Sequence, residues 1–171
     1  MTAVLPHRIA PHVRWMIRRD LPEVLNSEMV STADPWTEDE ILRELRSRHT
    51  IGMVSEYRDN VVGHMIYRLE RCSIVTLRFV VDRDFRRMGV GTALMTKLIG
   101  KLSPDRRCQL VVPCSEWCTD LHHFLLAMGL RATAVIRGDD ADIYRFVAFC
   151  EPPPASPGSL VDCGGEEVGR E

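Results

Sequence analysis

The sequence lacks the features that mark several large classes of protein. No apolar run approaches the roughly 20 residues that a membrane-spanning helix needs, and residues 1–19 carry prolines and arginines in place of a continuous apolar segment. We therefore expect neither a signal peptide nor a membrane partner, and we expect a cytoplasmic location. The chain has six cysteines in 171 residues. In that compartment they are expected to be reduced thiols and not a disulfide framework.

A strong charge of either sign is also missing. The formal net charge is −2, from 22 Lys and Arg against 24 Asp and Glu. Nucleic-acid-binding domains usually carry a pronounced basic surface, so no nucleic-acid partner is expected. Acidic side chains gather with prolines and glycines in residues 151–171. Such a segment buries too little apolar surface to offset its ordering entropy, which predicts a disordered acidic tail. Residues 1–11 are predicted to be a flexible N-terminus.

Deleting residues 151–171 is therefore expected to leave the melting temperature nearly unchanged, because the tail is predicted to contribute no packed surface. Thermal unfolding of the full-length and truncated chains, followed by circular dichroism, checks this. A large drop would show that the tail packs on the domain and that the boundary at residue 150 is wrong.

The region from 12 to 150 alternates between the hydrophobic period of a strand and that of a helix. The predicted strands are 13–18, 50–57, 61–69, 74–81, 108–112, 132–136 and 143–149, and the predicted helices are 21–30, one capped by Thr37, 89–102 and 116–128. Glu40 follows Thr37 by three residues, which is the spacing of a capping box. The order β-α-α-β-β-β-α-β-α-β-β predicts one α/β domain around a mixed sheet.

Residues 86–92, with the sequence Arg-Arg-Met-Gly-Val-Gly-Thr, join an apolar strand to a helix. Gly89 and Gly91 allow the backbone to approach a ligand closely. The exposed N–H groups of the loop and of the first helical turn, together with the helix dipole, make an anion site suited to a pyrophosphate. Arg86 and Arg87 add positive charge, and Thr92 adds a hydroxyl donor.

Other interpretations of this loop fit less well. A Walker loop needs a Gly-Lys-Ser/Thr sequence that is missing here, and Leu94 stands where a Rossmann fingerprint needs glycine. The remaining alternative is a glycine-rich turn with two solvated arginines. The strand before the loop and the amphipathic helix after it favour a ligand site.

The segment from Phe85 to Leu94 resembles the pyrophosphate motif of the GNAT N-acetyltransferases, Arg/Gln-x-x-Gly-x-Gly/Ala. Residues 80–82 resemble the end of that family's fourth strand, 126–130 its Leu-Gly-Phe helix end, and 142–144 its last strand. The start of the second helix, 36–38, resembles the RimI-like branch, which acetylates the N-terminal alanine of a ribosomal protein. The resemblance covers about 13–149.

The resemblance implies a mostly antiparallel sheet with helices on both faces, in which the fourth and fifth strands splay apart. It implies acetyl-coenzyme A as cosubstrate and no metal. Pantetheine would lie between the splayed strands on backbone groups near Val80 and Val81. The residues implied for the pyrophosphate are Arg86, Arg87, Met88, Gly89, Val90, Gly91 and Thr92. The implied activity is acetyl transfer to a primary amine, of a small molecule or a protein N-terminus, by direct attack in a ternary complex.

The positions of the RimI-like base and acid carry no acid–base group. Counting back from the glycine that ends the last helix, the glutamate position falls at Pro113, the tyrosine at Leu125 and a frequent asparagine at Cys118. A second hypothesis is therefore a non-catalytic acetyl-coenzyme-A sensor or scaffold. Glu116 and Tyr144 are the replacement candidates, against the alternatives of a surface acid and a half-buried aromatic ring.

One further group of residues has the spacing of a metal site. Cys114, Cys118 and His122 follow one another at intervals of four residues. A zinc site usually takes ligands from at least two segments, so buried thiols and a partly exposed histidine are the favoured interpretation. The sequence indicates neither the acceptor nor the oligomeric state.

Overall fold

The hydrophobic periods of the chain produce the predicted order of elements. In the computed structural model, which describes residues 8–150, they are β1 (His12–Trp15), α1 (Leu21–Ser31), α2 (Glu38–Leu45), β2 (Thr50–Tyr57), β3 (Asn60–Leu69), β4 (Ser73–Val81), α3 (Val90–Ile99), β5 (Gln109–Ser115), α4 (Thr119–Ala127), β6 (Arg131–Ile136) and β7 (Ile143–Phe149). Short 3-10 turns stand at Arg18–Asp20 and Arg83–Phe85. The predicted fold class is confirmed.

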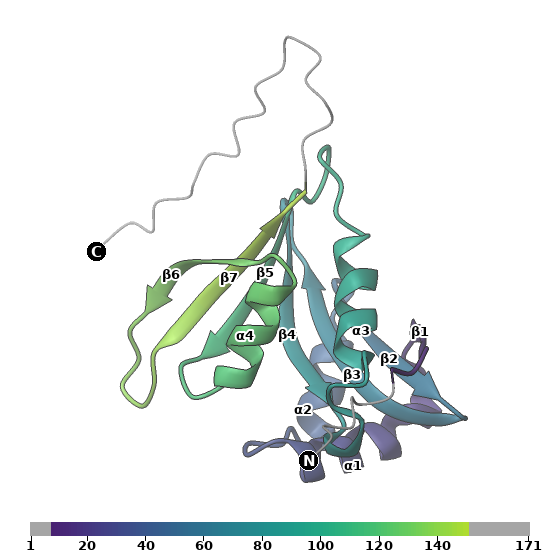
Figure 1. Ribbon diagram of the computed structural model, residues 1–171. Coiled ribbons are helices and arrows are strands. Elements are labelled where there is room, and N and C mark those ends of the chain that lie inside the picture. Colours follow the sequence, from purple (N-terminus) through teal and green to yellow (C-terminus); the bar gives the residue numbers. More distant parts are fainter. Residues whose placement is uncertain (1–7, 151–171) are drawn as a thin grey trace.

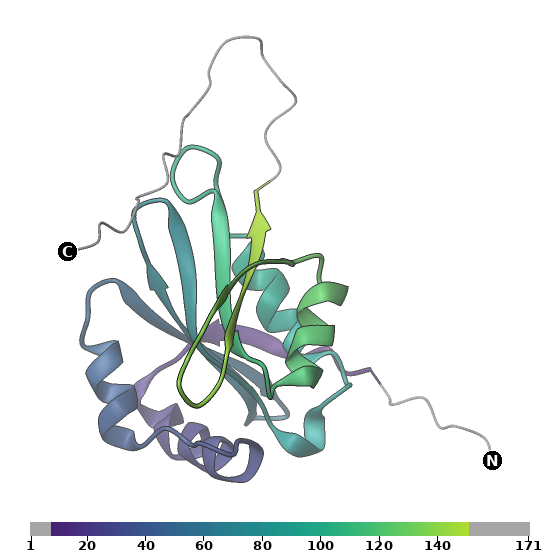
Figure 2. The ribbon, with the colours of Figure 1, turned by 90° about the vertical axis from the view of Figure 1, so that its left-hand side faces the viewer.

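The strands form one sheet in the order β1-β2-β3-β4-β5-β7-β6 (Figure 1). Every neighbouring pair is antiparallel except β4 and β5, which are parallel. Figure 2 shows α1 and α2, in purple and blue, on one side of the sheet and α3 and α4, in teal and green, on the other. No helix within residues 8–150 is long and apolar enough to cross a membrane.

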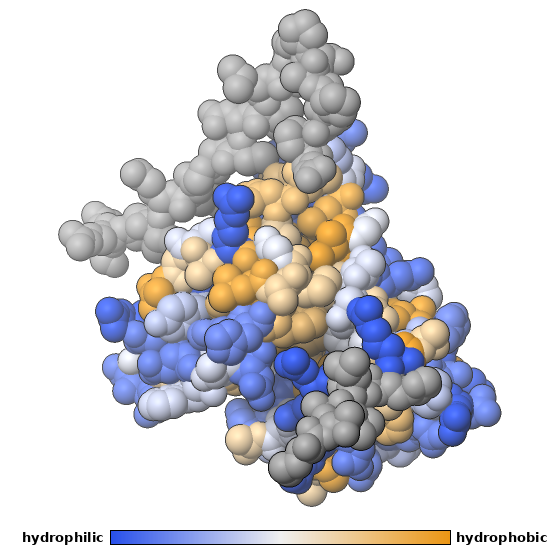
Figure 3. Space-filling model, viewed as in Figure 1, coloured by the Kyte–Doolittle hydropathy of each residue, from blue (hydrophilic) through white to orange (hydrophobic). Residues whose placement is uncertain are grey.

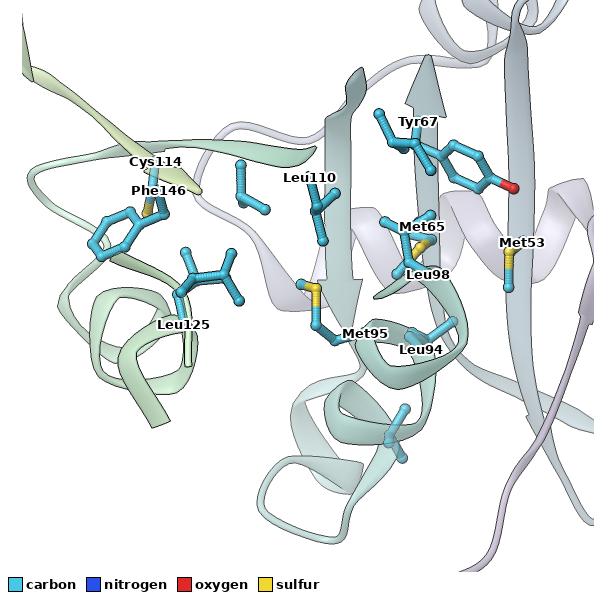
Figure 4. Close-up of a cluster of buried hydrophobic side chains, with 14 of the residues drawn as sticks. Met53, Met65, Tyr67, Leu94, Met95, Leu98, Leu110, Cys114, Leu125 and Phe146 are labelled. Carbon is cyan, nitrogen blue, oxygen red and sulfur yellow. The ribbon is translucent and has the colours of Figure 1, made fainter. Parts of the chain in front are cut away.

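Each face of the sheet has its own apolar core. The larger lies under α3 and α4 and includes Met53, Met65, Tyr67, Leu94, Met95, Leu98, Leu110, Cys114, Leu125 and Phe146 (Figure 4). The smaller lies under α1 and α2, around Val24, Ile41, Val54, Val61 and Ile66. Tyr67 is fully buried, and its burial raises the pKa of its phenol to about 12, so this ring packs and stays protonated.

Local signals account for several element boundaries. The N–H of Thr37 donates to Glu40 Oε2 at 2.8 Å, and the N–H of Glu40 points back to Thr37 Oγ1, which confirms the predicted capping box. The β2–β3 hairpin turns at Arg58 and Asp59, both at positive φ, a backbone whose twist matches that of the flanking strands.

Four predicted boundaries are wrong by three residues. The predicted strand 13–18 ends at Trp15, where the chain turns into a 3-10 helix, and the predicted helix 89–102 ends at Ile99, just before Gly100. The predicted strand 108–112 runs on to Ser115 and includes Pro113, and the predicted helix 116–128 begins only at Thr119. The antiparallel partner explains the extension. The N–H of Glu116 donates to the Asp142 carbonyl. The backbone N–H and C=O groups of even-numbered β5 residues therefore point to β7, and the backbone of Pro113 points away from β7. The missing N–H of Pro113 therefore costs no bond to β7.

A buried carboxylate joins α1 to the centre of the sheet. Glu28 is fully buried. It accepts hydrogen bonds from Arg78 Nε at 2.9 Å, from His64 Nε2 at 2.9 Å and from the N–H of Trp36 at 3.1 Å. Because a carboxylate only accepts, His64 Nε2 carries a proton. Burial alone would raise the pKa of Glu28, but these donors outweigh it and hold the pKa at about 2.

Glu28→Gln is expected to lower the free energy of unfolding by about 3 to 5 kcal/mol at pH 7, because Arg78 loses a buried counter-charge. Because the pKa of Glu28 is lower in the folded state than its ordinary value of 4.5, the ionised carboxylate stabilises the fold above pH 4.5. This stabilisation is lost as the pH falls towards 2. The difference in free energy of unfolding between wild type and variant should therefore become smaller as the pH falls from about 5 to about 2. Denaturant titrations at several pH values measure it.

The matched control is Glu44→Gln. Glu44 pairs with Arg68 at 2.8 Å, and both side chains are partly exposed. Pairs of this kind contribute about 1 kcal/mol or less. If Glu28→Gln and Glu44→Gln lowered the free energy of unfolding equally, the special role of the buried carboxylate would be contradicted.

Candidate functional site

The centre of the sheet opens where β4 and β5 separate. Only three residue pairs join these strands: Ser73 with Gln109, Ile74 with Leu110, and Val75 with Val111. Beyond them the strands diverge, and Figure 1 shows β5, β7 and β6 swinging away from β4. The opening between the two strands is the candidate site, and two local features produce it.

The first feature is a β-bulge in β4. Ile66 of β3 pairs with Arg78, but the next residue, Tyr67, pairs with Thr76. Leu77 is thus an extra residue in β4. A bulge of this kind bends the strand and increases its twist, which turns the end of β4 away from β5.

The second feature is Pro113. Because the backbone groups of even-numbered β5 residues point to β7, those of odd-numbered β5 residues point to β4. The next ladder donor after Val111 would be residue 113, and proline has no N–H to give. The parallel ladder therefore stops at this point, and the rest of β4 keeps a free edge.

Backbone alternation decides which β4 groups point into the opening. The N–H of Asp82 donates to the Val62 carbonyl at 3.0 Å, so Val80 faces β3 as well, where it pairs with His64. Phe79 and Val81 then present their backbone groups to the opening. Of the two predicted valines, only Val81 lies at the free edge. Sequence reasoning missed Phe79, because strand alternation selects residues only once the partner of Asp82 is known.

The loop that follows β4 leaves the start of α3 uncapped. Gly89, at φ 96°, is the N-cap residue, and no side chain caps the helix. The first helical bond runs from the N–H of Ala93 to the Gly89 carbonyl at 3.0 Å. The amides of residues 90–92 therefore lack helical partners and carry the positive end of the helix dipole. Such a terminus is suited to an anion.

Gly91 lies against two aromatic rings, at the distance of ordinary van der Waals contact for a Cβ. A Cβ at this position would lie 3.4 Å from both Phe124 Cζ and Phe79 Cζ. These rings stack at 5.7 Å between centroids and 16° between planes, which joins α4 to β4 across the site. Between α3 and α4 the surface is largely apolar (Figure 3). A side chain larger than alanine at position 91 would fill the space beside the uncapped amides.

The two predicted arginines differ in position. Arg86 Nη2 donates to the Ser31 carbonyl at 2.6 Å, and its Nε donates to the Val81 carbonyl at 3.4 Å. Arg86 therefore fastens the loop to the C-terminal end of α1. Arg87 is exposed and at positive φ. Within residues 8–150 its guanidinium makes no polar contact, which leaves it available to a bound anion.

Of the two replacement candidates for acid and base, Glu116 has a backbone partner and Tyr144 packs against a histidine ring. Glu116 Oε1 accepts from the N–H of Asp142 at 3.0 Å and fastens the end of β5 to the chain before β7. The half-buried Tyr144 ring lies 5.0 Å from the His122 ring. Leu125 is fully buried beside Cys114 and Phe146 (Figure 4), and Pro113 is exposed.

The residues with metal-site spacing have other partners. His122 Nε2 donates to the Ser115 carbonyl at 3.0 Å. Cys114 is buried, and its burial raises the pKa of the thiol to about 12, which disfavours the thiolate that metals bind. Among residues 8–150 no group of three His, Cys, Asp or Glu side chains is placed to hold a metal ion.

The uncapped amides, the glycine at 91 and the free β4 edge fit the pyrophosphate and the pantetheine arm of coenzyme A. Solved structures with the same fold include the ribosomal-protein-S18-alanine N-acetyltransferase from Escherichia coli, with 16% identity and a TM-score of 0.76 over 88% of this chain and 100% of that chain. They also include Ard1 from Thermoplasma volcanium, with 24% identity and a TM-score of 0.74 over 83% of this chain and 99% of that chain.

A third similar structure is Arabidopsis thaliana NAA60 in complex with a bisubstrate analogue, with 12% identity and a TM-score of 0.71 over 83% of this chain and 99% of that chain. No curated protein sequence matches the chain. The model of the acetyltransferase (GNAT) family matches residues 11–129, more than half of the sequence. The chain therefore belongs to the GNAT acetyltransferase family, and its class is that of an N-acyltransferase that uses acetyl-coenzyme A.

Proposed function

We propose that the protein transfers the acetyl group of acetyl-coenzyme A to a primary amine, foremost the N-terminal amine of a protein, by direct attack in a ternary complex. One observation carries the proposal. The free edge of β4 runs directly into the loop that ends at the uncapped start of α3. In coenzyme A an extended pantetheine arm is joined to a pyrophosphate. The arm matches the β4 edge, and the pyrophosphate matches the start of α3.

Each part of the site has a separate task. The amides of residues 90–92 and the side chain of Arg87 hold the pyrophosphate, and Gly91 keeps the space beside them open. The backbone groups of Phe79 and the N–H of Val81, whose carbonyl accepts from Arg86, hold the pantetheine arm as an added strand would be held. Acetyl-coenzyme A supplies an activated acetyl thioester.

The main chain also supplies the catalytic group that this site retains. An N–H at the β4 edge, of Phe79 or Val81, stabilises the negative charge that develops on the thioester oxygen. Holding amine and thioester together supplies a further large share of the rate. Because Pro113 and Leu125 carry no titratable group, the ammonium ion of the acceptor loses its proton to water, and the thiolate leaves without a side-chain acid.

The acceptor approaches β4 from the side of α1 and α2. Arg78 Nη2 donates to the Asp34 carbonyl at 2.6 Å, and the guanidinium lies 5.4 Å from the centroid of the Trp36 ring. These contacts hold the α1–α2 connection beside the free part of β4. The E. coli protein with the same fold is, by its name, an N-acetyltransferase that acts on an alanine of ribosomal protein S18, which supports a protein amine as acceptor.

Gly91→Glu is expected to lower affinity for acetyl-coenzyme A at least 100-fold, because it places bulk and negative charge among the α3 amides. Isothermal titration calorimetry measures the affinity. Gly100→Glu is the matched control, since it makes the same change at the other end of α3, away from the amides of residues 90–92 and with Cβ contacts no closer than those at Gly91. Equal affinity in wild type and Gly91→Glu would contradict the proposed coenzyme site.

Leu125→Tyr is expected to speed acetyl transfer, because the family resemblance implies a phenol at this position that protonates the departing thiolate. Leu125 is fully buried beside Cys114 and Phe146, so the longer ring has to extend out of this core towards the opening. General acids contribute about 10² to 10⁴ in rate, so we expect slow wild-type turnover and at least a tenfold gain in the variant. Thiol release in the presence of peptide acceptors measures the rate. Leu126→Tyr, at the exposed neighbouring position, is the control, and melting temperatures check that both variants fold.

Two outcomes would contradict this account of catalysis. Fast wild-type turnover that is insensitive to position 125 but collapses in Tyr144→Phe or Glu116→Gln would show that those residues are the acid and base. Intact coenzyme binding without turnover in wild type and Leu125→Tyr, across the whole acceptor panel, would favour the sensor or scaffold.

A further inference from the structure

A groove runs along the flank of α3 that faces β1. It has a volume of about 660 Å³ and lies between residues 11–13 on one side and Ala93, Thr96, Lys97, Gly100 and Lys101 on the other. Figure 1 shows β1 on one side of α3 and α4 on the other. Gly91, which lies against Phe124 of α4, belongs to the coenzyme side. The groove is therefore separate from the proposed coenzyme site.

The groove is basic. The chain contains two lysines against 20 arginines, and both lysines, Lys97 and Lys101, line the groove. Neither forms an ion pair with an acidic side chain of residues 8–150. The Lys101 ammonium lies 4.3 Å from the centroid of the exposed Trp15 ring, a cation–π contact that holds it beside β1. The two positive charges are thus available to an anionic partner.

β1 presents a free strand edge beside these lysines. It is the first strand of the sheet, so only its β2 side is paired. The N–H of Met16 donates to the Gly52 carbonyl at 3.0 Å. The backbone groups of even-numbered residues therefore point to β2, and those of Val13 and Trp15 point away from it. The Trp15 carbonyl accepts from Arg14 Nη1 at 3.2 Å. Within the described part of the chain, the Val13 N–H and carbonyl and the Trp15 N–H have no partner.

The free edge and the two lysines lie side by side. The N–H of Ile9 donates to the carbonyl of Met88, just before α3, and Trp15 lies beside Lys101, just after α3. The chain from 9 to 15 therefore follows the helix. Residues four apart on a helix are separated by about 6 Å along its axis, and residues two apart on a strand by about 6.6 Å. A strand added to β1 can thus place two successive side chains of one face opposite Lys97 and Lys101.

We propose that this groove is a docking site for an extended acidic segment of a partner protein. The segment adds to the free edge of β1 and directs alternate Asp or Glu side chains to Lys97 and Lys101. Main-chain hydrogen bonds and side-chain ion pairs share the recognition. The free edge favours a peptide over a nucleic acid, which has no row of backbone N–H and C=O groups to pair with β1. Docking here leaves the coenzyme opening, on the opposite flank of α3, accessible.

The test measures the binding of a short fluorescein-labelled peptide of alternating glutamate and threonine to the full chain, by fluorescence anisotropy. Exposed ion pairs each contribute up to about fivefold in affinity. The matched peptide of alternating glutamine and threonine should therefore bind about tenfold more weakly. Added salt should reduce this difference, because it screens exposed charges.

The contribution of the strand edge is tested on the peptide, so that the fold of the protein is not disturbed. Two versions of the acidic peptide carry N-methyl groups on alternate residues, one on the glutamates and one on the threonines. Only one of these sets removes the N–H donors that face β1. That version should bind about tenfold more weakly than the other, because it loses two or more main-chain hydrogen bonds.

The lysines are tested by substitution and by protection. Lys97→Gln and Lys101→Gln should each weaken binding of the acidic peptide about threefold. Arg48→Gln, which removes the same charge from an exposed position just after α2, is the control and should leave the affinity nearly unchanged. Because the chain has no other lysine, an N-hydroxysuccinimide acetate reagent modifies chiefly Lys97, Lys101 and the N-terminal amine. Bound peptide should protect both lysines in peptide maps by mass spectrometry.

Four results would overturn the proposal. The first is equal affinity of the two N-methylated peptides, and the second is unchanged affinity in both lysine variants. The third is tighter binding of a single-stranded oligonucleotide than of the acidic peptide. The fourth is a carbodiimide cross-link, in the full chain without peptide, from Lys97 or Lys101 to an acidic residue of 151–171. Such a link would show that this chain, or a second copy of it, supplies the occupant of the groove.

Discussion

Between β4 and β5 only three residue pairs are in register, and the geometry of the site depends on where that ladder stops. A bulge at Leu77 bends one strand, and Pro113 removes the donor that the other would need. If the ladder continued, the backbone groups of Phe79 and Val81 would be used by β5. Because it ends, β4 keeps a free edge in the interior of the sheet. That free edge is the surface on which an extended ligand arm can form main-chain hydrogen bonds.

The two faces of the sheet serve the opening in different ways. On one face, α3 brings its uncapped N-terminus to the end of β4, and the stacked rings of Phe79 and Phe124 join β4 to α4 beside it. On the other face, Glu28 collects Arg78 and His64 beneath α1. A buried charge of this kind is costly unless it is fully paired. Its pairing fixes the position of the α1–α2 connection beside β4.

The chemistry that remains possible here relies on the main chain. Backbone donors need no particular side chain, so a site of this kind can lose its usual carboxylate and phenol and still polarise a thioester. The same independence makes coenzyme binding and turnover separable properties in this chain. Pro113 is an example: it occupies the position of the base, but it contributes to the opening of the site and not to proton transfer.

The sequence by itself determined the order of elements, the capped start of α2 and the glycine loop before α3, because hydrophobic period, capping chemistry and glycine freedom are local properties. It could not decide which backbone groups of β4 are free. That choice depends on strand pairing between residues far apart in the chain, and one step of register exchanges Val80 for Phe79 and Val81. The roles of Arg86 and Arg87 look alike in the sequence for the same reason. Only the packing of α1 beside the loop, which places the Ser31 carbonyl within reach of Arg86, separates the arginine that fastens the structure from the one that is available to a ligand.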